Sequence, residues 1–232
     1  MNHFQNKLLT MLMGCLLIIS MVIVGKEAAE YVTGRKVQAR QPCVVIDAGH
    51  GGEDPGKVGI NGAAEKDVNL QIALLVKEYL EKNDIKVVMT REDGEGLNDA
   101  GASNKKVQDM KRRIELIEKT APVVTVSIHQ NSYPEEYVHG AQVFYYSGSK
   151  EGQKLAERIQ TQLVKKADPD NKRQIKANDS YYLLKKTGTP IVIVECGFLS
   201  NREEAERLCT SDYQEKIAWA IHMGILQYLN GR

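Results

Sequence analysis

Apolar runs alternate with polar, glycine-rich stretches along most of this chain, and the runs are of two kinds. Short continuous runs rich in β-branched residues have the length and composition of buried strands. They lie at residues 43–47, 85–90, 123–128, 141–146 and 191–195. Between them, apolar residues recur every three or four positions, which predicts amphipathic helices. These lie at 68–83, 107–119, 151–165, 181–186, 202–209 and 213–229, with loops expected at 49–62, 91–106, 131–139 and 168–178.

Strands that alternate with helices predict an α/β fold with a mixed, mostly parallel sheet, flanked by helices on both faces. In such sheets, ligands bind outside the carboxyl ends of the strands. His50, His129 and Glu195 all follow or end a predicted strand. The pattern therefore places a site at this end of the sheet.

The N-terminus breaks the alternation, because residues 8–24 are almost uninterrupted apolar sequence between Lys7 and Lys26. We interpret residues 1–25 as a signal peptide or an N-terminal membrane anchor. A cleaved signal needs small residues before its cleavage point, where this chain has Lys26 and Glu27, so an uncleaved anchor is favoured. Residues 26–41 are polar and are expected to be a linker, and residues 42–232 to form the folded domain.

Composition narrows the function only slightly. With 232 residues, 42% hydrophobic residues and a net charge of +1, the chain fits one globular domain with a short extension. It has no basic cluster, so we expect no nucleic-acid partner. Cys15 lies in the apolar run, which leaves an odd number of cysteines in the domain, so a disulfide framework is not expected. Cys43, Cys196 and Cys209 are expected to be packing thiols. An enzyme, a binding module and a scaffold remain.

Three residues of metal-binding type stand at the edges of predicted elements. His50 follows the first strand, Glu65 precedes the first helix and His129 follows the central strand. Together they form a His₂Glu set of the kind that holds catalytic zinc and leaves a fourth position for water. Taken singly, His129 is more often a core histidine, and Glu65 a helix-start acid that the helix dipole stabilises.

Phosphate binding is the alternative for the glycine-rich loop after the first strand. Residues 49–54, Gly-His-Gly-Gly-Glu-Asp, lack the third glycine of the dinucleotide fingerprint and the Lys-Ser/Thr of a P-loop. The adjacent carboxylates of Glu53 and Asp54 would also repel phosphate. A metal is the better interpretation of this loop.

Glu195 ends the apolar run Ile-Val-Ile-Val at 191–194. A carboxylate in such a position is costly to bury without a partner. It therefore predicts either a metal site or a proton-transfer group.

Four blocks together resemble the zinc-dependent N-acetylmuramoyl-L-alanine amidases of the amidase-3 type. The blocks are Asp-Ala-Gly-His-Gly-Gly-Glu-Asp-Pro-Gly at 47–56, Gly-Ala-Ala-Glu-Lys-Asp at 62–67, Ser-Ile-His-Gln-Asn at 127–131 and Glu-Cys-Gly-Phe-Leu-Ser-Asn at 195–201. Their order and separation are more specific than any single block. At positions 48, 130 and 196, this chain has Ala48, Gln130 and Cys196 in place of the usual residues of the family. None of these differences removes a metal-binding or proton-transfer group.

The resemblance implies a Zn²⁺ site formed by His50, Glu65 and His129, with Glu195 as the catalytic carboxylate. The expected reaction is hydrolysis of the amide between N-acetylmuramic acid and the L-alanine of the peptidoglycan stem peptide. Two alternatives remain open: a non-catalytic peptidoglycan-binding scaffold, and a zinc peptidase that cuts within the stem peptide.

The resemblance also bears on location and partners. An enzyme acting on peptidoglycan is expected to be exported and secreted or membrane-anchored, in contact with the membrane through its N-terminal apolar segment. A single amidase domain behind such a segment resembles the germination-specific spore-cortex amidases. The sequence has no recognisable wall-binding repeat, so targeting or activation falls to the N-terminal segment, the loops or a protein partner.

Overall fold

The structure is a computed structural model that describes residues 3–38 and 41–231. It divides into two units, Met1–Gln41 and Pro42–Arg232. The second unit contains a six-stranded sheet with the order β2-β1-β3-β6-β4-β5. The strands are β1 (Cys43–Ala48), β2 (Lys86–Met89), β3 (Val124–Asn131), β4 (Gln142–Tyr145), β5 (Lys176–Ala177) and β6 (Ile191–Phe198). The four strands β2, β1, β3 and β6 are parallel, and β4 is antiparallel to β6, so the predicted mixed, mostly parallel sheet is confirmed.

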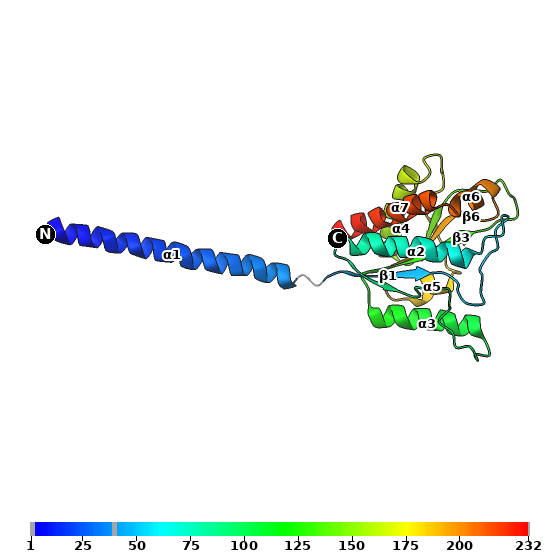
Figure 1. The fold of residues 1–232 in the computed structure, drawn as a ribbon, viewed down its shortest axis with the longest axis horizontal. Coiled ribbons are helices and arrows are strands. Elements are labelled where there is room, and N and C mark those ends of the chain that lie inside the picture. Colours follow the sequence, from blue (N-terminus) through cyan, green and yellow to red (C-terminus); the bar gives the residue numbers. More distant parts are fainter. Residues whose placement is uncertain (1–2, 39–40, 232) are drawn as a thin grey trace. The chain divides into compact units, whose positions relative to one another are not determined.

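Helices cover both faces of this sheet (Figure 1). One face is covered by α2 (Glu65–Glu81), α4 (Lys150–Lys166) and α7 (Ser211–Asn230), which pack against one another. The other face is covered by α3 (Lys105–Thr120) and the short α5 (Tyr182–Lys186). The short α6 (Arg202–Leu208) follows β6 and precedes α7.

The alternation of side chains along the strands decides which residues reach which layer. In β1, Val44 and Ile46 belong to the core under α2, α4 and α7, whereas Val45 belongs to the smaller core under α3 and α5. Asp47 has the same parity as Val45 and therefore meets α3, where it bonds Arg113. The parallel register pairs Asp47 with Ser127 and His129 with Glu195, so all four side chains emerge on the α3–α5 face.

Several predicted boundaries differ from the structure. We expected His129 and Glu195 at strand ends, but β3 continues to Asn131 and β6 to Phe198, with a register shift between His129 and Asn131. The ladder between the two strands holds these polar residues in extended conformation. The loop predicted at 168–178 contains the two-residue strand β5.

The cysteines were expected to be packing residues, and this holds for Cys196, which is fully buried. Cys43 is half-buried, while Cys15 and Cys209 are exposed. For Cys209 the expectation was wrong, because the residue caps the C-terminus of α6 at the surface. All four thiols are free.

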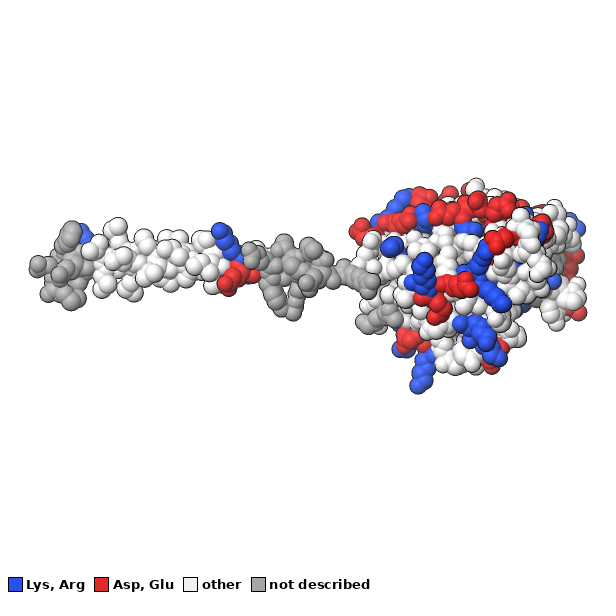
Figure 2. All heavy atoms as spheres, turned by 90° about the horizontal axis from the view of Figure 1, so that it is seen from below, with Lys and Arg blue, Asp and Glu red and all other residues white. Residues whose placement is uncertain are grey.

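The first unit consists of one long helix, α1 (His3–Gln38). Its segment Lys7–Ala29 is 23 residues long and apolar enough to cross a membrane. At about 1.5 Å per residue it spans about 34 Å, enough for a hydrocarbon core of about 30 Å. Between Lys7 and Lys26 the described surface carries no charged side chain (Figure 2). The expected linker at 26–41 is helical as far as Gln38, and residues 39 and 40 lie outside the described residues.

Candidate metal centre

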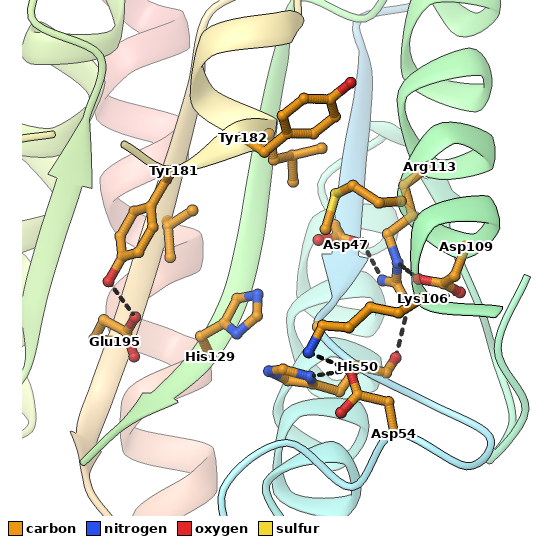
Figure 3. Close-up of a pocket in the computed structure, with 14 residues that line it drawn as sticks. Asp47, His50, Asp54, Lys106, Asp109, Arg113, His129, Tyr181, Tyr182 and Glu195 are labelled. Carbon is orange, nitrogen blue, oxygen red and sulfur yellow. Dashed lines mark hydrogen bonds and ion pairs between the residues drawn. The ribbon is translucent and has the colours of Figure 1, made fainter. Parts of the chain in front are cut away.

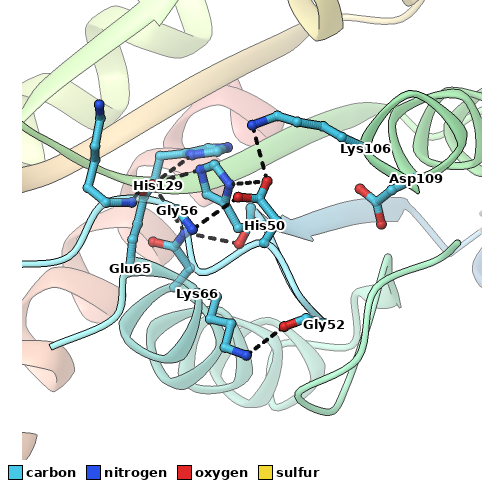
Figure 4. Close-up of polar contacts among 12 residues, drawn as sticks. His50, Gly52, Gly56, Glu65, Lys66, Lys106, Asp109 and His129 are labelled. Carbon is cyan, nitrogen blue, oxygen red and sulfur yellow. Dashed lines mark hydrogen bonds and ion pairs between the residues drawn. The ribbon is translucent and has the colours of Figure 1, made fainter. Parts of the chain in front are cut away.

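Three side chains from separate parts of the domain converge at the carboxyl end of the sheet. The ligand atoms offered by His50, Glu65 and His129 all lie within 4.8 Å of one another. Glu65 lies between the two histidines, with Oε1 2.9 Å from Nδ1 of His129 and Oε2 3.3 Å from Nε2 of His50 (Figure 4). The structure thus brings together the three residues proposed from the sequence.

Each of the three is held by a different element. His50 lies in the loop after β1 and has a left-handed backbone, with φ of 63°. Glu65 is the first residue of α2, and its Oε1 and Oε2 accept the backbone N–H groups of Gln130 (3.1 Å) and Lys57 (2.8 Å). His129 lies on β3 beside β6.

Two glycines make room for these side chains. A Cβ on Gly49 would collide with the ring of His129. A Cβ on Gly56 would lie 2.5 Å from Oε2 of Glu65 and 2.8 Å from Cδ2 of His50, and Gly56 also has a positive φ of 69°. The glycines of this loop therefore clear space for the candidate ligands.

The electrostatics favour an ionised carboxylate between the histidines. Burial acts to raise the pKa of Glu65, but the hydrogen bonds and charges of His129 and His50 outweigh it and hold the pKa far below its ordinary value. Burial likewise acts to lower the pKa of His50, but Glu65 and Asp54 outweigh it and raise the pKa. The carboxylate of Glu65 is therefore ionised and offers a negative charge between the two imidazole rings.

The orientation of His50 is fixed from behind by Asp54. Its Oδ2 lies 2.9 Å from Nδ1 of His50, so Nε2 is the ring nitrogen directed at Glu65. A carboxylate that receives the outer N–H of a metal-binding histidine fixes its tautomer and raises its basicity. Asp54 was not assigned this role from the sequence, although its position four residues after His50 is a usable signal.

These residues fit a zinc ion. Tetrahedral zinc with bonds of about 2.0–2.1 Å holds its ligand atoms about 3.4 Å apart, and the three ligand atoms here lie within 4.8 Å of one another. The set of two imidazoles and one carboxylate is a known catalytic zinc set. Small side-chain adjustments would turn the present bonds between Glu65 and the histidines into metal ligation.

Glu195 adds a second carboxylate beside this group. It lies opposite His129 on β6 and is 7% exposed. Its Oε1 accepts a hydrogen bond of 3.3 Å from the Tyr181 hydroxyl, while its Oε2 is buried and has no hydrogen-bond partner among the described residues. Burial raises the pKa of Glu195. A buried carboxylate with one free oxygen is suited to exchanging a proton with a ligand.

His50, His129 and Glu195 line a single cleft of about 140 Å³ between α3 and α5 (Figure 3). Its walls combine the ionisable residues with apolar side chains of Met110, Leu183 and Ile193. Tyr181 and Tyr182 lie over the cleft, and Lys106 reaches across it toward Asp54, 3.3 Å away. Tyr181 could not be predicted as part of the site, because nothing in its local sequence indicates that its hydroxyl reaches Glu195.

Comparisons with known proteins show which proteins this chain is similar to. The family model described as N-acetylmuramoyl-L-alanine amidase, amidase 3, matches residues 44–227. A germination-specific N-acetylmuramoyl-L-alanine amidase of Bacillus subtilis is 38% identical over 188 residues, which are 80% of this chain and 78% of the relative.

Solved structures give the same result. The CwlD amidase of Clostridioides difficile, solved in complex with the GerS lipoprotein, superposes with a TM-score of 0.81 at 38% identity, covering 83% of this chain and 100% of that one. An N-acetylmuramoyl-L-alanine amidase of Clostridium difficile 630 gives a TM-score of 0.75 at 31% identity, covering 84% of this chain and 100% of that one.

Proposed function

This chain belongs to the amidase-3 family of N-acetylmuramoyl-L-alanine amidases, and we propose that it works through a zinc site of His50, Glu65 and His129 with Glu195 as the proton-transfer group. The chain is an enzyme of the cell wall, and its reaction is hydrolysis of the amide between N-acetylmuramic acid and L-alanine in peptidoglycan. The observation that supports the proposed site is the convergence of three ligand atoms within 4.8 Å, beside a buried carboxylate oxygen without a partner.

Zinc bound there would act as a Lewis acid on the scissile carbonyl and lower the pKa of a water molecule to about 7. The protein's own groups would handle the proton. Oε2 of Glu195 is free to accept a proton from the attacking water and to donate it to the departing alanine nitrogen. Such general acid–base catalysis contributes roughly a hundred- to ten-thousand-fold.

The surrounding residues would hold the reacting groups in place. The Tyr181 hydroxyl would hold Oε1 of Glu195 by a hydrogen bond, so that Oε2 stays available for proton transfer. Asp54 fixes Nδ1 of His50. The apolar walls of the cleft would exclude water from the substrate amide, and its open side would admit the polymer.

Digestion of purified peptidoglycan tests the reaction, with mass analysis of the released fragments and zinc analysis of the protein. Release of stem peptides that begin with L-alanine, by a protein containing one zinc per chain, supports the proposal. Shorter peptides would identify a peptidase instead, and binding without release would identify a scaffold. A fully active protein that retains no zinc after chelation would exclude the zinc site.

The N-terminal helix supports the proposal that the amidase domain is exported across the cytoplasmic membrane. Substrate outside the cytoplasmic membrane requires the domain to cross it, and Lys7–Ala29 is long and apolar enough for a signal or an anchor. We assign 1–25 to that segment, 26–41 to a linker and 42–232 to the amidase domain. Fractionation of cells that produce the full chain would distinguish an anchored from a released domain.

The germination-specific relative and the lipoprotein complex of the CwlD structure suggest a narrower role. We assign this enzyme to spore-cortex peptidoglycan during sporulation and germination, with a protein partner for targeting or activation. Cortex analysis of spores that lack the enzyme tests this assignment. If the cortex muropeptides of such spores are unchanged, the substrate is the vegetative cell wall and not the cortex.

A further inference from the structure

The main chain that carries His50 is held by two buried arginines. Three consecutive carbonyls, those of Ala48, Gly49 and His50, accept hydrogen bonds from the guanidinium groups of Arg91 and Arg113. Arg91 is 5% and Arg113 is 1% exposed. Neither residue belongs to the candidate ligand set.

This stretch of backbone needs support from outside. His50 has a φ of 63°, and the left-handed conformation costs a residue with a side chain about 1–2 kcal/mol. Ala48 and Gly49 are also buried, so that their carbonyls require hydrogen-bond donors. The two guanidinium groups provide donors to all three carbonyls, and Nδ2 of Asn69 on α2 also donates to the carbonyl of Gly49, at 3.1 Å.

Arg113 approaches from α3. It donates to the carbonyls of Ala48 (2.8 Å) and His50 (2.6 Å), and it is itself oriented by carboxylates (Figure 3). Asp47 lies 2.5 Å and Asp109 2.6 Å from its guanidinium nitrogens. These partners fix Arg113 rigidly on one side of the loop.

Arg91, two residues after the end of β2, makes a different set of contacts. Its Nε donates to the carbonyls of His50 (2.8 Å) and Ala48 (3.0 Å), and its Nη2 donates to Gly49 (3.1 Å). The same Nη2 also donates to the carbonyl of Lys66, at 2.7 Å. Lys66 is the residue after Glu65 in the first turn of α2, so Arg91 connects the loop of one candidate ligand to the helix of another.

We propose that Arg91 is a positioning residue for the metal centre, whose planar guanidinium sets the separation of His50 and Glu65. The inference rests on the zinc site proposed above. Arg113 supports the same loop from α3. Lysine could not replace Arg91, because it offers one flexible ammonium where arginine offers five N–H groups in a rigid plane.

The test is zinc binding by Arg91→Lys in the full chain, measured by competition with a chromophoric chelator. Loss of a residue that orients metal ligands costs about 10- to 100-fold in metal affinity. We expect the zinc dissociation constant to rise by that factor and activity to return at saturating zinc. Thermal unfolding of the metal-free protein is measured in parallel.

Arg173→Lys is the matched control. Arg173 also donates to a carbonyl, that of His139 at 2.7 Å, and stacks on Phe198. Among the described residues, it forms no hydrogen bond, ion pair or ring contact with the candidate ligands or with the loop that carries His50. We expect its zinc affinity to be that of the wild type. A positioning role requires Arg91→Lys to lose affinity while the unfolding temperature of its metal-free form falls no further than that of the control.

The inference is overturned if Arg91→Lys binds zinc as tightly as the wild type, or if its affinity falls only together with the stability of its metal-free form. If Arg91→Lys does not fold, Arg91→Gln, whose side-chain amide keeps N–H donors in a plane, undergoes the same titration, and unchanged affinity there overturns the proposal. Failure of the wild type to bind zinc would instead overturn the proposed function itself.

Discussion

His129 and Glu195 lie directly opposite each other on the adjacent parallel strands β3 and β6. Because the strands are in register, both side chains emerge on the face covered by α3 and α5 and line the same cleft. Nδ1 of His129 faces Glu65, whereas Oε2 of Glu195 has no hydrogen-bond partner among the described residues. The sheet itself thus places a candidate metal ligand beside a candidate proton-transfer group.

Glu195→Gln should separate these two roles. The amide cannot accept a proton, so we expect turnover to fall roughly a hundred- to ten-thousand-fold, while zinc content stays that of the wild type. Mass analysis of peptidoglycan digests and metal analysis of the same samples provide the measurement. Wild-type turnover by this variant would remove Glu195 from the mechanism.

His129→Ala should lose the metal. Two of three protein ligands remain, so we expect little zinc after dialysis and no detectable digestion of peptidoglycan. Chelation of the wild type should abolish activity, and added zinc should restore it in the wild type only. Normal zinc content in His129→Ala would exclude this residue from the ligand set.

Tyr181→Phe should lower turnover without loss of the fold. The ring of Tyr181 packs edge-on against Phe144, with centroids 5.5 Å apart, and this contact survives the substitution. The hydroxyl that holds Oε1 of Glu195 is lost, and we expect kcat to fall about tenfold, equivalent to about 1.4 kcal/mol, at unchanged KM and zinc content.

Tyr213→Phe is the control for this change, since the Tyr213 hydroxyl is buried and has no hydrogen-bond partner among the described residues. It should keep wild-type kcat. Equal kcat for Tyr181→Phe and the wild type would show that Tyr181 does not orient Glu195.

Stability should decline in acid through Asp47. Burial acts to raise the pKa of Asp47, but Arg113, Ser127 and Thr90 outweigh it and lower the pKa to about 2 from 3.8. A carboxylate whose pKa is lower in the folded than in the unfolded protein stabilises the fold. This contribution is complete above the pKa of the unfolded state and is lost as the pH falls through the pKa of the folded state. The shift corresponds to about 2 kcal/mol, lost between about pH 4 and pH 2.

Denaturant unfolding of the wild type and Asp47→Asn over this pH range measures that contribution. We expect the free energy of unfolding of the wild type to fall by about 2 kcal/mol more than that of the variant, because the variant lacks the titrating group. Parallel curves for the two proteins would contradict the assignment to Asp47.

The main helices and strands and the candidate functional groups could be predicted from the amino-acid sequence. Continuous β-branched runs predicted the buried strands, because only such side chains fill a sheet covered on both faces. A carboxylate in the run before Cys196 indicated an unusual role for Glu195, because burying it is costly. The glycine-rich loop that carries His50 was interpreted as part of a metal site, and the structure shows that Gly49 and Gly56 make room for the candidate ligand side chains.

The way in which these groups meet depends on the packing of the whole domain and could not be predicted from local sequence. The lengths of β3 and β6 depend on hydrogen bonds between the two strands. His129 and Glu195 therefore lie inside these strands, although the local sequence predicted that the strands end near these residues. The contacts of Tyr181 with Glu195 and of Arg91 with Gly49 join residues far apart in the chain. No local pattern encodes such contacts, because each depends on the packing of whole elements that places a side chain at its partner.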